Sequence, residues 1–527
     1  MPRVIGAADA VRVVTRRCVV RVGLGLAVGS VAGSAVAAAP VVQQVTAPDR
    51  MKGDRFGWST AIDGEVAVVG APGRTTGPYP GAGVVVTLRR TDGAWQVVQT
   101  LDEAGTASVG RQYGHRVAVA GGLMAIGAPS YGASGGVYLY HDADGTWTLD
   151  GLIYDQVPVT GERLGVAVAI SGTTALAGTT YDGLPVMPGD TAVGRVRVFD
   201  YTSGWLEAAG IVPVDSEAGD RFGFAVAIDG ESALVGAPGK DGNHGVAYIF
   251  TRGDKGWTQV VKLAASDREV GDYFGSAVAL SGDVALVGSY NAMATIGEAY
   301  VFERQGEAWV QTQILMSPAP TVSEQFGYQV GLSGDYAMVT AYGFEYVANF
   351  GSRGGGYLFG RVATGYSLLT SLRVDDGVTG DLLGFGGALS GGVALLGAPY
   401  DDSVTQPAYD PGSGFGSAYV FRLNQAVGEL CTADEDCAVG AVCCAGLCAT
   451  ACAEEPTSSG EEGSGSSGGA VGETTASSGE ASSDGSPPAP ELEPLSEGCG
   501  CRTGGDGAGV WVLVVSLSRR RRRWRAV

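Results

Sequence analysis

Short apolar segments alternate with glycine-rich turns along most of the chain, and the same order recurs. In one copy the apolar segments 225–228 and 232–235 flank Asp229-Gly230, a pair typical of the tight turn of a β-hairpin. A third apolar segment, 245–250, follows, and a fourth begins at an aromatic residue. This pattern predicts a unit of four antiparallel β-strands.

The unit occurs seven times with a fixed inner spacing. Each copy opens on Phe-Gly, Tyr-Gly or Leu-Gly, and thirteen residues after this glycine comes a second glycine, replaced once by threonine. The opening glycines are Gly57, Gly114, Gly165, Gly223, Gly275, Gly327 and Gly384. Four-stranded units repeated at roughly 40 to 60 residues are typical of β-propeller blades. The predicted fold class is therefore all-β, a seven-bladed β-propeller of four-stranded antiparallel blades.

The tight turns and the ring closure follow from the same alignment. The two-residue turns between first and second strands are predicted at Asp63-Gly64, Gly121-Gly122, Ser171-Gly172, Asp229-Gly230, Ser281-Gly282, Ser333-Gly334 and Ser390-Gly391. The fourth strands are predicted to begin at Trp95, Trp147, Trp205, Trp257, Trp309 and Tyr366. The seventh unit has none, whereas residues 41–45 precede the first unit and resemble 96–99. We therefore expect 41–45 to complete the seventh blade and leave no exposed sheet edge.

The two glycine motifs resemble a known family. Four copies complete the second motif as Gly-Ala-Pro, at Gly70-Ala71-Pro72, Gly127-Ala128-Pro129, Gly236-Ala237-Pro238 and Gly397-Ala398-Pro399. Phe-Gly and Gly-Ala-Pro at this separation resemble the FG-GAP repeat of integrin α-chain propellers, over about residues 41–421. The resemblance implies a seven-bladed propeller that works outside cells in adhesion or ligand binding. It also implies calcium loops of Asp-x-Asp-x-Asp-Gly type, but the two-residue turns here cannot supply six to eight oxygen ligands, so no metal site is carried over.

Candidate ligand-binding residues lie on the connections between second and third strands. These connections share one face with the links between blades, and three of them are long and rich in aromatic residues. The candidates are Tyr181, Tyr342, Phe344, Tyr346, Tyr400 and Tyr409. Exposed aromatic side chains on the loops of a rigid scaffold suit the binding of sugars or proteins. The alternative is that they pack within their own loops.

A second feature belongs to the same face. The residue three positions before each opening glycine is acidic in six of the seven copies and is Arg111 in the second copy. The acidic residues are Asp54, Glu162, Asp220, Asp272, Glu324 and Asp381. These carboxylates could form a ring that attracts a cation. Alternatively each accepts backbone hydrogen bonds in the link between blades, and the recurrence in nearly every blade favours this interpretation.

Enzymatic chemistry has little support in the sequence. The three histidines, His115, His141 and His244, form no metal-binding pair, and there is no nucleophile elbow. We predict no catalytic residues, no metal and no cofactor. A hydrolase that uses two carboxylates of the propeller, for example on polysaccharide, remains an alternative.

Charge separates the two ends from the rest. Residues 1–39 carry five Arg and one Asp before an apolar run and an Ala-x-Ala site, which predicts an export signal. We favour the general secretory route, and a twin-arginine route stays open. At the other end, residues 499–527 hold Cys499 and Cys501, a short apolar segment and an arginine cluster. This order resembles the myxobacterial MYXO-CTERM sorting tail, which implies processing near the cysteines and display on the cell surface; a plain basic tail is the alternative.

Two further segments lie between the propeller, assigned to 40–427, and this tail. Residues 428–453 contain Cys431, Cys437, Cys443, Cys444, Cys448 and Cys452 without histidine, which in an exported chain favours three disulfides of open connectivity over zinc. Residues 454–498 are Ser, Gly, Glu and Pro with ten acids and no base, which predicts a disordered stalk.

The net charge of the chain limits the classes of partner that it could bind. The net charge is −21, and residues 40–501 alone carry −31, which argues against nucleic acid. A membrane contact is expected only through the C-terminal tail before processing. Together these features predict an exported, extracellular or surface-displayed, non-catalytic binding or adhesion protein whose partner is an unidentified protein or glycan. A structural envelope component is the further alternative.

Overall fold

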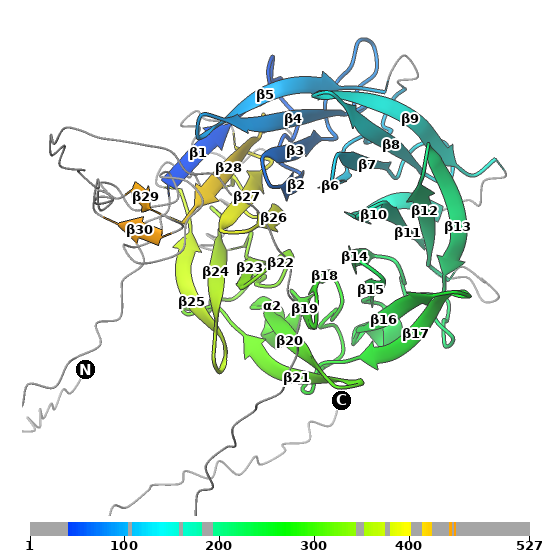
Figure 1. The fold of residues 1–527 in the computed structure, drawn as a ribbon, viewed down its shortest axis with the longest axis vertical. Helices are drawn as coiled ribbons and strands as arrows, with labels where there is room; N and C mark the ends of the chain where they lie inside the picture. Colours follow the sequence, from blue (N-terminus) through cyan, green and yellow to red (C-terminus); the bar gives the residue numbers. More distant parts are fainter. Residues whose placement is uncertain are drawn as a thin grey trace, which may run out of the picture. The chain divides into compact units, whose positions relative to one another are not determined.

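The computed structural model describes residues 41–103, 108–156, 162–181, 193–343, 352–374, 380–401, 414–423, 442–444 and 447–449. Seven sheets of four antiparallel strands are arranged as blades around a common axis (Figure 1). The predicted all-β, seven-bladed propeller is confirmed. In each blade the first strand of the unit lies nearest the axis and the fourth strand lies at the rim (Figure 1).

The strands follow the chain order of the repeat. The innermost strands are β2 (Ser59–Asp63), β6 (Arg116–Ala120), β10 (Glu162–Ser171), β14 (Ala225–Asp229), β18 (Ala277–Ser281), β22 (Val330–Ser333) and β26 (Gly386–Ser390). The second strands are β3 (Val66–Ala71), β7 (Leu123–Ala128), β11 (Thr174–Tyr181), β15 (Ser232–Ala237), β19 (Val284–Ser289), β23 (Tyr336–Thr340) and β27 (Val393–Ala398).

The outer half of each blade is built in the same way. The third strands are β4 (Val84–Thr91), β8 (Gly136–Ala143), β12 (Arg195–Tyr201), β16 (Val246–Gly253), β20 (Glu298–Gln305), β24 (Gly356–Val362) and β28 (Ser417–Arg422). The rim strands are β5 (Ala94–Leu101), β9 (Thr146–Tyr154), β13 (Trp205–Ile211), β17 (Gly256–Leu263), β21 (Ala308–Leu315), β25 (Gly365–Leu372) and β1 (Val41–Val45). Two single helical turns, α1 (Lys240–Asn243) and α2 (Ala292–Thr295), connect second to third strands in blades four and five.

The ring closes through its first strand, as the sequence predicts. Strand β1 pairs antiparallel with β28, so the seventh blade has the order β1-β28-β27-β26. The Gln44 side-chain amide donates to the Tyr419 hydroxyl at 2.9 Å and to Asp401 at 3.2 Å. The Gln43 amide donates to the carbonyl of Trp95 at 2.8 Å and accepts its N–H at 2.9 Å, which ties the seventh blade to the rim of the first.

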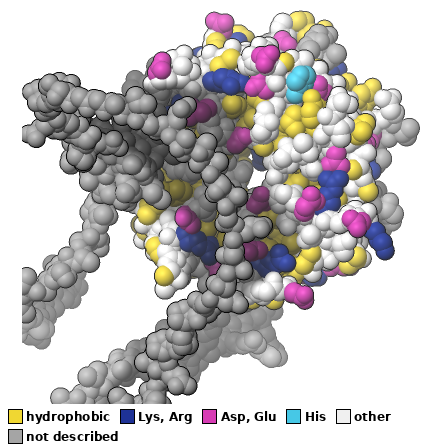
Figure 2. All heavy atoms as spheres, viewed as in Figure 1, with side chains coloured by type: hydrophobic (Ala, Val, Ile, Leu, Met, Phe, Trp, Pro, Cys, Tyr) yellow, Lys and Arg dark blue, Asp and Glu magenta, His cyan; other side chains and the backbone are white. Residues whose placement is uncertain are grey.

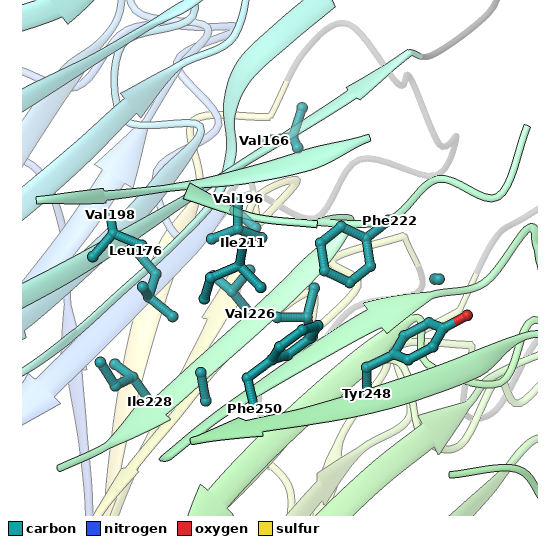
Figure 3. Packing of buried hydrophobic residues seen from close by; sticks show 14 of the residues in the cluster. Val166, Leu176, Val196, Val198, Ile211, Phe222, Val226, Ile228, Tyr248 and Phe250 are labelled. Carbon is teal, nitrogen blue, oxygen red and sulfur yellow. The ribbon is translucent and has the colours of Figure 1, made fainter. Parts of the chain in front are cut away.

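The hydrophobic core lies between neighbouring blades. Figure 3 shows one such layer, in which Val196 and Ile211 of blade three face Phe222, Val226 and Phe250 of blade four. Phe222, the aromatic residue of a Phe-Gly motif, has no exposed surface. Burying such a ring is worth about 1.5–3 kcal/mol, so each motif aromatic contributes directly to holding two blades together.

The fixed spacing of thirteen has a structural cause. Within blade four the Gly223 N–H donates to the carbonyl of Gly236 at 3.1 Å, which starts the inner hairpin. Between blades, a Cβ added to Gly236 would lie 1.9 Å from the carbonyl oxygen of Gly275 in blade five. The two glycines of the repeat are therefore joined by a hydrogen bond within a blade and packed backbone to backbone across the blade interface.

The tight turns lie one residue later than predicted in six blades. Asp229 pairs with Ser232 at the end of the ladder, so the two turn residues are Gly230 and Glu231. Asp229 is instead the last strand residue, and its carboxylate accepts the N–H of Gly282, the turn glycine of blade five, at 2.6 Å. Asp or Ser precedes the turn glycine because its side chain forms a hydrogen bond with the neighbouring blade. In blade two the turn lies at Gly121-Gly122, as predicted.

The cysteine-rich segment is described only as a hairpin of β29 (Val442–Cys444) and β30 (Leu447–Ala449), where Cys443 pairs with Cys448 along the backbone. The predicted signal 1–39, the stalk 454–498, the tail with Cys499 and Cys501, and Cys431, Cys437 and Cys452 lie outside the described residues. Among the described helices, none is long and apolar enough to span a bilayer.

Candidate binding site at the axis of the ring

The predicted loop aromatics fall into two sets. Tyr342 and Tyr400 are described, and each lies two residues after the second strand of its blade and is partly exposed. Tyr181 is the last residue of β11, but its side chain lies outside the described part of the chain. Phe344, Tyr346 and Tyr409 also lie outside it.

Tyr342 belongs to a larger group of rings at the inner ends of the blades. We call this group the axial arc and define it as His115, Trp58, Phe385, Tyr328, Tyr342, Tyr290 and Tyr273. Four of its members occupy one repeat position, directly after the opening glycine and just before the innermost strand. The sequence predictions missed this position, although the run of Trp, His, Tyr and Phe beside the glycines was a readable signal.

The rings of the axial arc contact one another across five blades. Trp58 of blade one lies 5.9 Å from His115 of blade two and 4.4 Å from Phe385 of blade seven, between ring centroids. Phe385 lies 5.1 Å from Tyr328 of blade six, which is 4.3 Å from Tyr342. The arc continues to blade five, because Tyr328 lies 5.9 Å from Tyr290, which stacks on Tyr273 at 5.8 Å. These distances are typical of favourable aromatic pairs.

Exposure distinguishes the axial arc from the aromatic core of the blades. The motif rings Phe56, Tyr113, Phe222, Phe274 and Phe326 are fully buried between blades. Every ring of the axial arc, in contrast, keeps part of its surface accessible. Partly exposed aromatic residues held in mutual contact form an available apolar surface with polar edges, which is the composition of many ligand sites.

A repeated tight turn positions these side chains. The residue before each motif aromatic has a left-handed backbone in six blades, with φ of 56° to 61° at Arg55, Gln112, Arg221, Tyr273, Gln325 and Leu382. In five of these blades the carbonyl of this residue accepts the N–H three positions later, as from Trp58 to Arg55 at 3.2 Å. The turn therefore brings the two side chains together, and the Arg55 guanidinium lies over the ring of Trp58 at 5.5 Å and that of Tyr400 at 5.7 Å.

Positive charge accompanies the axial arc. Arg116, the first residue of β6, donates one hydrogen bond to the carbonyl of His115 at 3.2 Å, and no ion pair to it is found among the described residues. Burial lowers the pKa of Arg116, while Tyr328 of blade six has the reverse effect. The pKa of His115 is held well below its usual value by burial, by Arg116 and by Arg163. His115 is therefore neutral near pH 7, and arginine supplies the charge.

Two polar atoms of the axial arc make no hydrogen bond to any described residue. Trp58 Nε1 and His115 Nδ1 are both inaccessible to solvent, and neither makes a hydrogen bond among the described residues. An unpaired buried polar group costs about 1–3 kcal/mol. Unpaired Nε1 atoms also occur at the rim, at Trp205 and Trp257, so the two atoms support a candidate site here only together with the exposed rings of the arc.

The acidic residues before the motifs are structural. Asp54, Asp220, Asp272 and Glu324 each accept a backbone N–H three residues earlier, at 2.5 to 3.0 Å. In three blades the carboxylate also pairs with a base that follows the second strand: Asp54 with Arg74, Glu162 with Arg195, and Asp220 with Lys240. Burial raises the pKa of Asp54, Glu162, Asp220 and Asp272. These buried groups fix the links between blades, which confirms the favoured interpretation.

Blade two has an ion pair at the same place, but the basic residue stands at the repeat position that is acidic in the other blades. Arg111 stands at the acidic position, and the buried carboxylate of Glu103 lies 3.3 Å from its guanidinium. Desolvation raises the pKa of Glu103 to about 7, against the opposing effect of Arg111. The guanidinium of Arg111 also lies 4.3 Å from the ring centroid of Tyr131.

On the face drawn in Figure 2 and among the described metal-ligating residues, no second site is evident. On the face drawn in Figure 2, acidic and basic side chains are interspersed with apolar ones. Within the described ranges, no three His, Cys, Asp or Glu side chains converge in a way that could hold a metal ion.

Comparison with known proteins agrees with the repeat geometry. A family model described as FG-GAP repeat matches residues 41–83, 205–250 and 257–302. The matched segments fall in blades one, three, four and five and include the closing strand β1. No curated protein matches the chain. The chain thus contains segments that match the FG-GAP repeat three times, within a seven-bladed β-propeller.

Proposed function

We propose that this FG-GAP propeller is a non-catalytic binding or adhesion protein that works at the cell surface or outside the cell. FG-GAP propellers are typical of binding and adhesion proteins, and the repeats occur in extracellular or surface proteins. The observation that carries the proposal is the axial arc, a continuous row of partly exposed aromatic rings on an otherwise closely packed ring.

The contact surface we propose is the face that holds the links between blades and the connections of second to third strands. Tyr342 and Tyr400 bring these connections to the axis, because Tyr342 contacts Tyr328 and Tyr400 shares the Arg55 guanidinium with Trp58. A rigid scaffold that presents aromatic residues in this way loses little side-chain entropy on binding. Export and the C-terminal tail would place this face outside the cell.

A glycan array probed with the purified chain and with Tyr342→Ala and Tyr400→Ala variants tests this function. We expect specific binding that both variants weaken by about tenfold or more, and a matched change on the opposite face, Tyr201→Ala, to leave it unchanged. Turnover of a polysaccharide by the purified propeller would favour the hydrolase alternative. Absence of binding to glycans and to cell-surface proteins would favour a structural envelope role.

A further inference from the structure

We propose that the axial arc binds an acidic saccharide, with sugar rings on the aromatic faces and carboxylates on Arg116 and Arg55. This inference rests on the proposed binding function and specifies its ligand class. The first observation is the length of the arc, which runs through successive ring contacts of 4.4 to 5.9 Å from His115 to Tyr273. So extended a surface suits several units of a chain better than a single small group.

The second observation is the sign of the charge. Arg116 has no carboxylate partner among the described residues, and Arg55 is held against aromatic rings of Trp58 and Tyr400. The carboxylates of the neighbouring links are engaged elsewhere, such as Asp54 with Arg74 at 2.6 Å. A cationic group from a partner would be repelled here, whereas a carboxylate would regain the pairing that the arginine side chain lacks.

The third observation is the set of polar edges. Trp58 Nε1 is a buried donor and His115 Nδ1 a buried ring nitrogen, both unpaired among the described residues. Because the pKa of His115 is well below its usual value, its ring is neutral near pH 7 and one ring nitrogen can accept a hydrogen bond. The tyrosines of the arc add phenolic groups. Sugars offer many hydroxyl groups that both donate and accept, so they match this mixture better than an acidic peptide does.

The geometry assigns distinct roles to the two arginines. Arg116 is the first residue of β6, directly after His115, and its guanidinium donates to the His115 carbonyl at 3.2 Å. Arg55 comes from the left-handed turn of blade one, where its φ is 57°. The turn is tied to the second strand β3, because the Gly57 N–H donates to the carbonyl of Gly70 at 3.1 Å. We assign carboxylate pairing mainly to Arg116 and entry of the charged chain to Arg55.

Binding of matched sugar probes tests this inference. The full chain is titrated calorimetrically with a hexamer of galacturonic acid, with its methyl ester, which keeps the rings and removes the charge, and with a hexamer of glutamic acid. We expect the acid sugar to bind at least about tenfold more tightly than its ester, and rising salt to weaken only the acid form. Arg116→Gln and Arg55→Gln should each reduce this preference about tenfold.

Controls separate this inference from the proposed function. Arg304→Gln removes a half-exposed arginine near the turn between third and fourth strands of blade five, and should change nothing. Thermal melting checks that the Arg116→Gln variant is folded. If that variant is unfolded, the Arg55→Gln variant and the salt series test the role of the arginines.

Equal binding of the acid and the ester, with both lost in Tyr342→Ala, overturns the inference and leaves the binding function standing. Tighter binding of the acidic peptide overturns the saccharide assignment. Absence of binding to all three probes overturns the inference, and the glycan array decides the function separately.

Discussion

The second glycine of the repeat is required at the blade interface because the backbone of the next blade contacts it there, and not only because of a turn. At Gly236 the neighbouring carbonyl oxygen of Gly275 occupies the position of a side chain, at 1.9 Å from an added Cβ. Thr340 stands at the equivalent position of blade six, where its Cβ lies 3.1 Å from the Cβ that Gly384 lacks. The contact between blades six and seven therefore accommodates a side chain at Thr340. In most other blades two glycines allow the backbones to pack directly against each other.

A substitution at this contact tests it. Gly236→Ala should destabilise the chain by about 3 kcal/mol or more, because two blade backbones must separate to admit the methyl group. Gly253→Ala is the matched control, since an added Cβ there meets nothing within 4 Å. Chemical denaturation of both variants measures the difference. Equal stabilities would show that the interface tolerates a side chain.

The ion pair of Arg111 and Glu103 in blade two predicts a pH dependence. Glu103 has a pKa of about 7 in the folded chain, against 4.5 ordinarily, because burial disfavours its charged form. Between these values the folded state binds more protons than the unfolded state, so the free energy of unfolding should fall as pH rises from about 4.5 to 7. The decrease should be at most about 3 kcal/mol, since one pKa unit corresponds to about 1.4 kcal/mol.

Denaturation at a series of pH values measures this decrease, and Glu103→Gln isolates its source. The neutral amide cannot ionise, so the variant should lose the slope that Glu103 contributes between pH 5 and 7, whatever its absolute stability. A slope that is unchanged in Glu103→Gln would assign the pH dependence to the other buried carboxylates, Asp54, Glu162, Asp220 and Asp272, whose pKa values burial also raises.

Strand β1 stabilises the ring through its side chains as well as through its backbone hydrogen bonds to β28. It buries Val45, while Gln43 bonds both backbone groups of Trp95 and Gln44 reaches Asp401 and Tyr419. The Gln43 contact is repeated at the rim by Gln99 with Trp147 and Gln313 with Tyr366. The closing strand therefore joins the last blade to the first by the same side-chain device that joins neighbours elsewhere in the ring.

Removal of this strand should open the ring. A chain that begins at residue 48 should melt about 10 °C or more below one that begins at residue 40, because it loses a row of backbone hydrogen bonds and exposes the edge of β28. The chain beginning at 40 is the control for loss of the predicted export segment. Similar melting temperatures for the two would contradict closure by β1.

The number, order and closure of the strands could be predicted because the repeat is local and periodic. Seven copies of one glycine spacing define the blades, and the resemblance of 41–45 to 96–99 identifies the closing strand. The turn position was wrong by one residue in six blades because Asp and Ser at its start serve a bond to the next blade, such as Asp229 to Gly282. Such contacts between blades leave no local pattern.

The site was only partly predictable for a related reason. Tyr342 and Tyr400 were found from their loops, but Trp58, Tyr328 and Phe385 lie far apart in the chain and meet only when the ring closes. The positive charge at the axis was missed because the acidic residues before the motifs dominate the sequence there. Those acids are buried in the links, and Arg55 and Arg116 remain beside the arc.

For the whole molecule, the two-residue inner turns predict independence from calcium. Turns such as Gly230-Glu231 cannot supply six to eight oxygen ligands, and the described residues hold no converging metal-ligand set. Adding calcium or a chelator should shift the melting temperature of the full chain by less than about 1 °C, because these inner turns offer no site through which calcium could stabilise the folded state. A calcium-dependent rise of several degrees would contradict this expectation.

We propose that the ring binds its partner at the axis. Hydrogen exchange of the full chain, measured with and without the strongest-binding glycan of the array, tests it most directly. We predict slowed exchange in the segments that carry the axial arc, at residues 55–58, 113–116, 326–329 and 383–386, and little change in the rim strands β5, β9 and β17. Protection confined to the rim, with the axial segments unchanged, would contradict binding at the axis.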